Sequence, residues 1–174
     1  MDDASVVEAQ IGRPVRAPVT VEVRCHLGLP VVIDVPPILD DGTPFPTTHW
    51  LTCPLATLRV SRLESEGAIK DADARIASDP DLADRWGAAM RRYEAQREGR
   101  IPADHSGPRP TGGIAGSRWG VKCLHAQYAD TAAGNENPIG SDVAIAVEPL
   151  DCVTPCVHAP DGVPVRDPEW REPS

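Results

Sequence analysis

Cysteine and histidine are the residues of this sequence best suited to metal chemistry. The chain has five cysteines, of which Cys25, Cys53 and Cys123 stand in separate segments, and His125 follows two positions after Cys123. Zinc takes about four ligands in a tetrahedron, and its structural sites favour cysteine thiolates with histidine. If the three segments converge, these three cysteines with either His125 or Cys156 would complete a Cys₃His or Cys₄ set. The sequence therefore predicts a candidate zinc site.

Two features of the spacing support a different interpretation, in which the cysteines belong to the core. Only Cys152 and Cys156 are close in sequence, and the chain has no C-x-x-C motif. Free cysteine is commonly a small buried hydrophobic residue, which is the alternative for Cys25 and Cys123. If Cys123 and His125 both lie within a helix, their side chains point about 200° apart, and one metal could not easily take both. Both interpretations stay open.

Cys53 is also a candidate reactive thiol. It directly precedes Pro54, which is typical of a helix start, and a helix N-terminus favours a thiolate. His49 would fall on the same face if the preceding strand continued through Cys53. A Cys–His nucleophile also needs an orienting acid, which the sequence does not place. Burial of the thiol is the simpler alternative.

A glycine-rich segment, residues 111–118, is a candidate anion site. We expect it to lead into a helix that carries Lys122 and His125, with Arg118 four residues before Lys122 on the same face. Backbone N–H groups at a helix start favour phosphate or carboxylate. The predicted site consists of Gly112, Gly113, Arg118, Lys122 and His125. The segment lacks the Walker spacing, and its alternative is a flexible connection with a solvated basic turn.

Composition narrows the function classes. The net charge of −9 opposes general binding of nucleic acid, because a phosphate backbone would be repelled. No apolar run approaches the roughly 20 residues of a membrane helix, so we expect no membrane association. The acidic start of the chain lacks the layout of a secretory signal, and the number of cysteines is odd. We therefore expect a cytoplasmic protein with reduced thiols.

The elements that must position these residues are short strands followed by helices. Alternating β-branched residues predict strands over 19–25 and 30–35, joined as a hairpin, and a third strand over 47–52. Helical spacing predicts helices over 54–66, 68–78, 80–98, 117–133 and 142–147. The fold class is α+β, a small antiparallel sheet covered by three or four helices. We expect one domain over 1–158 and a disordered tail over 159–174, which is rich in proline.

Several ordered motifs resemble a known bacterial family. They are Arg24-Cys25-His26-Leu27-Gly28-Leu29-Pro30, Gly42-Thr43-Pro44-Phe45-Pro46, Trp50-Leu51-Thr52-Cys53-Pro54, Val121-Lys122-Cys123-Leu124-His125 and Asn137-Pro138-Ile139-Gly140. In this order they are similar to the domain-of-unknown-function family numbered 501, over about Val7 to Cys156. The resemblance implies relatives but no activity, because the family has none established.

Two classes of function follow. The first is a small protein that binds an anionic small molecule or a protein partner through the glycine-rich segment and the following helix. The alternative is a metal- or thiol-dependent enzyme with a Cys/His site, with zinc as its cofactor in the metal form.

Overall fold

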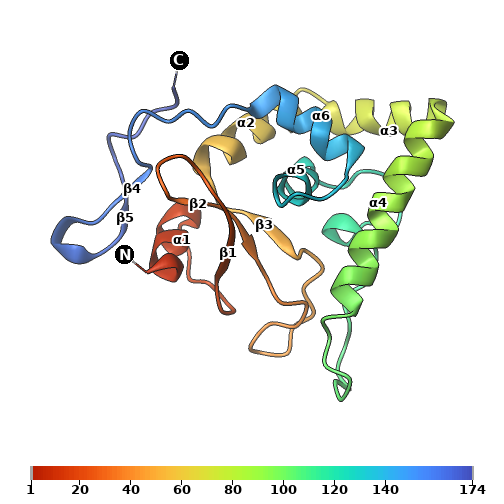
Figure 1. Ribbon diagram of the computed structural model, residues 1–174, viewed down its shortest axis with the longest axis horizontal. Helices are drawn as coiled ribbons and strands as arrows, with labels where there is room; N and C mark the ends of the chain where they lie inside the picture. The colour runs from red at the N-terminus through yellow and green to blue at the C-terminus, as the bar shows by residue number, and fades with distance from the viewer. Residues whose placement is uncertain (1, 174) are drawn as a thin grey trace.

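The first third of the chain forms a small antiparallel sheet with a helix beside it (Figure 1). The computed structural model describes residues 2–173. Strands β1 (Thr20–Arg24), β2 (Pro30–Asp34) and β3 (His49–Leu51) pair in the order β1-β2-β3, all antiparallel. β1 and β2 form the predicted hairpin, in which Gly28, with a φ of 77°, donates its N–H to the Cys25 carbonyl at 2.9 Å.

Helices gather around one end of this sheet. Residues 2–173 contain α1 (Asp3–Ile11), α2 (Pro54–Ser65), α3 (Ala68–Ser78), α4 (Pro80–Glu98), α5 (Leu124–Ala132) and α6 (Pro138–Val147). Figure 1 shows α1 against the sheet near the N-terminus and α2 to α6 on the other side, with α4 outermost. The main core joins β2 and β3 to α2, α5 and α6. The predicted α+β class, a small sheet with several helices, is confirmed.

Helix starts follow local capping signals. Proline occupies the first turn of α2, α4 and α6. The Asp79 side chain accepts the Leu82 N–H at 3.1 Å and so caps α4 as predicted. Helix α6 begins earlier than the predicted residue 142, because the Asn137 side chain caps it by accepting the Gly140 N–H at 3.0 Å.

The helix predicted from residue 117 is wrong in its first turns, because α5 begins only at Leu124. Gly116 and Gly120 have φ values of 67° and 62°, the left-handed conformation that interrupts a helix. A Cβ on Gly120 would lie 2.9 Å from the carboxylate of Asp73, which leaves no room for a side chain. The segment before α5 is therefore an ordered turn, fixed by these two glycines and by the contact with Asp73.

The C-terminal segment crosses back over the sheet side of the molecule. Strands β4 (Val157–His158) and β5 (Val165–Arg166) pair as a second antiparallel sheet, which the sequence did not predict. Glu172 accepts a hydrogen bond from Arg62 on α2 at 2.9 Å. The disorder and domain boundary expected at 159–174 stay predictions, and residue 174 lies outside the described residues.

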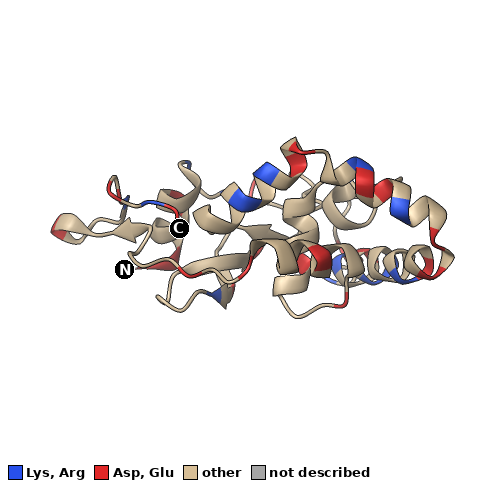
Figure 2. Cartoon of the chain, turned by 90° about the horizontal axis from the view of Figure 1, so that it is seen from above, with Lys and Arg blue, Asp and Glu red and all other residues tan. Residues whose placement is uncertain are grey.

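Both signs of charge occur along the outer helices. Figure 2 shows acidic and basic residues interspersed at the end of the molecule that holds α3 and α4. This distribution gives that end no single-sign field to attract a polyanion. In the described part of the chain, every helix is too short or too polar to cross a membrane.

Candidate metal centre

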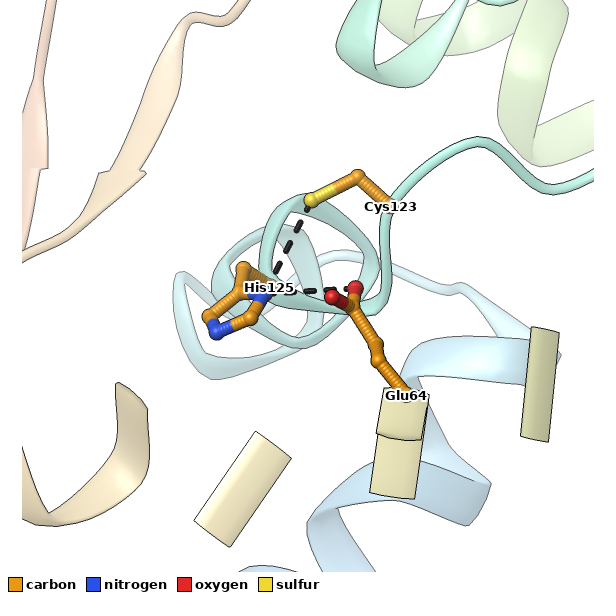
Figure 3. A group of neighbouring side chains, drawn as sticks. All are labelled: Glu64, Cys123 and His125. Carbon is orange, nitrogen blue, oxygen red and sulfur yellow. Dashed lines mark hydrogen bonds and ion pairs between the residues drawn. The ribbon is translucent and has the colours of Figure 1, made fainter. Parts of the chain in front are cut away.

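Three side chains with metal-binding atoms converge where α2 meets the start of α5 (Figure 3). Glu64 belongs to the last turn of α2, Cys123 precedes α5, and His125 is the second residue of α5. Nδ1 of His125 lies 3.2 Å from Oε1 of Glu64 and 3.8 Å from Sγ of Cys123. One oxygen, one sulfur and one nitrogen atom thus lie within 4.8 Å of one another.

The backbone at Cys123 makes this convergence possible. Cys123 has φ −157° and ψ 120°, which is extended, so its side chain is not governed by the helical spacing. The condition under which Cys123 and His125 would point apart, a helix through both residues, is therefore not met. Glu64 is fixed from the other side, since its Oε1 accepts the Leu124 N–H at 2.7 Å. The Glu64 carboxylate thus caps the N-terminus of α5.

Hydrogen bonds outside the cluster orient the imidazole. Nε2 of His125 lies 3.2 Å from the Thr57 carbonyl and 3.1 Å from Oγ of Ser61. Because a carbonyl can only accept, this contact places a proton on Nε2. Without metal the Glu64 carboxylate favours a second proton on Nδ1, and loss of that proton turns the Nδ1 lone pair toward the cluster. Burial lowers the pKa of His125, but the Cys123 contact, the charge of Glu64 and the Thr57 carbonyl together raise it above its usual value.

The two separations from Nδ1 of His125 are close to those that a tetrahedral zinc ion imposes. Zinc–nitrogen, zinc–oxygen and zinc–sulfur bonds of about 2.0, 2.0 and 2.3 Å give N···O and N···S separations of about 3.3 and 3.6 Å. The corresponding distances in this cluster are 3.2 and 3.8 Å. A ligating histidine usually donates its other N–H to a carbonyl or carboxylate, and ligating carboxylates are themselves hydrogen-bonded. Both outer contacts are present here.

The cluster lies at the wall of a cavity of about 700 Å³. Cys123 and His125 line it, and the rest of the wall is contributed by the end of α1, by β3, by α2 and by the C-terminal segment. Arg13 and Arg166 also line it, 5.5 Å from the ring centroid of Trp50 and 4.7 Å from that of Trp170, respectively. Within residues 2–173, neither guanidinium has a carboxylate within 4.0 Å. The cavity is thus bordered by two cations without acidic partners.

A family profile described as "Protein of unknown function (DUF501)" matches residues 21–144. The chain belongs to this family. No curated protein and no solved structure matched the chain in the other two comparisons. The matched range includes Glu64, Cys123 and His125, so the whole candidate metal centre of this DUF501 protein lies within the residues that the family profile covers.

The predicted metal set divides between two places in the DUF501 structure. Cys123 and His125 meet Glu64, whereas Cys25 and Cys53 line a different, much smaller cavity together with Cys152 and Cys156. Burial raises the pKa of the Cys53 thiol to about 11, which opposes the reactive thiolate considered for that residue. The prediction of one site for all four residues therefore fails on geometry.

The predicted anion set is also dispersed. Of its five residues, only His125 lines the large cavity. Gly113 is buried, donates its N–H to the Ser117 carbonyl at 2.8 Å, and its carbonyl accepts from the buried guanidinium of Arg97 at 3.4 Å. Arg118 donates to Oγ1 of Thr111 at 3.0 Å. The remaining two members, Gly112 and Lys122, lie in the same non-helical stretch. Anion binding by the loop stays a prediction.

A second group, Glu22, Asp34 and His49, also brings three ligand atoms within 4.8 Å. The Asp34 carboxylate is already held by both terminal nitrogens of Arg100, at 2.6 and 2.5 Å. Since this ion pair neutralises the carboxylate, the group suits a metal less well than the Glu64 cluster does.

Glu64 is the member of the candidate metal centre that the sequence analysis did not predict. One signal could have identified it: it stands in the last turn of a predicted helix, where the helix dipole disfavours an acid. In this protein the acid is stabilised by two other contacts, the N-terminus of α5 and the His125 ring.

Proposed function

We propose that this DUF501 protein is a zinc-dependent enzyme whose metal is held by Glu64, Cys123 and His125. The observation that carries the proposal is the cluster itself, in which an oxygen, a sulfur and a nitrogen lie within 4.8 Å of one another and the nitrogen is 3.2 and 3.8 Å from the other two. The outer hydrogen bonds of His125 and Glu64 add support, because a site built only for packing does not need them.

A zinc ion held by three protein ligands would leave a fourth position for water. Cys123 and His125 border the cavity, so a molecule bound in the cavity would lie beside this ion. A zinc ion in such a site lowers the pKa of its bound water to about 7, which supplies hydroxide at neutral pH. The reaction class that follows is hydrolysis of a polar bond in a molecule bound in the cavity. The oriented imidazole of His125 serves as a ligand in this scheme.

The cavity walls indicate the substrate class. Arg13 and Arg166 suit a phosphate or carboxylate group, since a guanidinium can bind either with two hydrogen bonds. Trp50 and Trp170 provide flat apolar surface beside the two cations. We therefore propose a small anionic substrate with an apolar body.

Metal content and cobalt spectroscopy test the site. Untagged protein prepared with zinc is expected to retain the ion, and cobalt substitution is expected to give the charge-transfer absorption of a cobalt–thiolate bond. Glu64→Gln, Cys123→Ser and His125→Ala are expected to reduce metal binding at this site. Glu66→Gln, a change of the same chemistry at an exposed position two residues away, is the matched control.

A thiol-dependent enzyme is the second candidate, supported by the 3.8 Å contact between Sγ of Cys123 and the His125 ring. Rapid alkylation of Cys123 in a protein that binds no metal at this cluster would favour it over the zinc proposal. Binding of anions without either property would instead favour the interpretation as a binding protein.

A further inference from the structure

Four of the five cysteines surround one small cavity that the proposed reaction does not use. Cys25, Cys53, Cys152 and Cys156 all line a space of about 10 Å³. Figure 1 shows how this occurs: the turn between β1 and β2 lies beside the start of α2, and the segment after α6 passes both. A space of about this size is at the lower limit for a single water molecule or ion.

The sheet fixes two of these cysteines. The Cys25 N–H binds the Leu29 carbonyl at 2.9 Å at the end of the hairpin. The Cys53 N–H binds the Val31 carbonyl at 3.3 Å, at the end of β3. Strand β2 and the residue just before it therefore hold Cys53 and Cys25, and both residues line the same cavity.

The other two cysteines come from the C-terminal segment as a Cys-x-x-x-Cys turn, Cys152-Val153-Thr154-Pro155-Cys156. Both are buried, whereas the three residues between them are exposed. The turn thus directs both sulfur-bearing residues inward. Nε2 of Gln10, on α1, lies 3.7 Å from Sγ of Cys156 and donates to it.

The chemistry of the lining is that of a soft-metal site. Besides Gln10, the cysteines share this cavity only with leucine and proline residues, so among the described residues no carboxylate or amine of its lining competes for an ion. Four thiolates in a tetrahedron are a standard structural set for zinc. Packing alone explains one buried cysteine, but it does not explain why four of the five, from three distant segments, line one small cavity.

We infer that Cys25, Cys53, Cys152 and Cys156 form a second, structural zinc site that fastens the C-terminal segment to the sheet. Zinc–sulfur bonds of about 2.3 Å require sulfurs about 3.8 Å apart. Among the described residues no three of these sulfurs lie within 4.8 Å of one another, so binding draws the side chains inward by rotation about their Cα–Cβ bonds. Zinc displaces the four thiol protons, and its affinity consequently rises with pH.

Cadmium NMR of the wild-type protein tests the inference, and two variants identify the resonances. Protein loaded with ¹¹³Cd is expected to show a resonance in the range of all-sulfur coordination, separate from that of the mixed Glu64 site. The all-sulfur resonance is expected to disappear in a Cys152→Ser, Cys156→Ser variant and to persist in Glu64→Gln. Absence of an all-sulfur resonance from the full-length wild-type protein overturns the inference, even if the mixed site is occupied.

Thiol counting provides the second measurement. Native protein with zinc is expected to leave these four cysteines unreacted with iodoacetamide, and a chelator is expected to expose them. A free-thiol count lowered by two after unfolding would reveal a disulfide, and unchanged protection after chelation would reveal plain burial. Either of these results overturns the zinc inference. The proposed function is tested separately, because it depends on Glu64, Cys123 and His125.

Discussion

Substitution of Glu64 separates its role as a helix cap from its role as a metal ligand. Its Oε1 accepts the Leu124 N–H at 2.7 Å and lies 3.2 Å from Nδ1 of His125. Glu64→Gln keeps the accepting oxygen and loses only the charge, whereas Glu64→Ala loses both. One hydrogen bond of this kind contributes about 1 kcal/mol. We expect Glu64→Ala to lower the free energy of unfolding by about 1 kcal/mol more than Glu64→Gln does. Both should weaken zinc binding at least about tenfold.

The pH dependence of these effects has a definite sign. The side chains of His125 and Glu64 are 23% and 25% exposed, so their ion pair contributes about 1 kcal/mol or less to metal-free stability. Because folding raises the pKa of His125, this contribution is complete below its unfolded value of about 6.5 and is lost as the pH rises through the raised value. Zinc requires the neutral ring, so stabilisation by zinc has the opposite sign and grows as the pH rises.

Urea unfolding followed by circular dichroism, at about pH 5.5 and about pH 8, measures both effects. The wild type, Glu64→Gln and Glu64→Ala are compared with added zinc and with a chelator. Since zinc bound elsewhere stabilises all three proteins, the difference between wild type and Glu64→Gln isolates this cluster. Equal stabilisation of these two proteins by zinc at the higher pH would refute the assignment of Glu64 as a ligand.

The remaining predictions concern the anion and the core. We expect phosphate to raise the melting temperature of the wild type and of an Arg118→Ala, Lys122→Ala variant, but not that of an Arg13→Ala, Arg166→Ala variant. A thermal-shift titration measures this, and the reverse result would place the anion on the glycine-rich loop. Asp130 is fully buried and accepts a hydrogen bond from the guanidinium of Arg92, on α4, at 3.1 Å. We expect Asp130→Asn to lower the free energy of unfolding by about 3 kcal/mol, as measured by urea unfolding. A loss below about 1 kcal/mol would show that this ion pair contributes no more to stability than an exposed pair does.

The parts of the fold that follow local rules were predictable. The β1–β2 hairpin follows from alternating residues around Gly28, and the starts of α2 and α4 follow from proline in the first turn. The start of α5 was not predictable in this way. Its position depends on the left-handed turns at Gly116 and Gly120, and the Asp73 carboxylate from a distant helix fills the space beside Gly120.

The candidate site was predictable in residue type but not in grouping. Cysteine and histidine were the residue types predicted to bind metal, and the sequence placed Cys53 with Cys123. In the structure, Cys53 lies instead with two cysteines of the C-terminal segment. Which cysteines meet depends on how that segment crosses the sheet, and no local spacing encodes it. Glu64 was missed for the same reason, because its partners lie about 60 residues further along the chain.

The two proposed metal sites share helix α2, which makes their independence measurable. Cys53 precedes its first residue and Glu64 belongs to its last turn, and eleven residues of helical rise separate them by about 16 Å. Sites this far apart usually contribute additively, within about 0.5 kcal/mol or a factor of about two in affinity. Leu55 and Val60 are fully buried, so α2 cannot shift without disturbing the core. We therefore expect a Cys152→Ser, Cys156→Ser variant to change cobalt affinity at the Glu64 cluster by no more than about twofold, measured by optical titration. A larger change would show that the C-terminal segment positions α2, and would join the two sites into one cooperative unit.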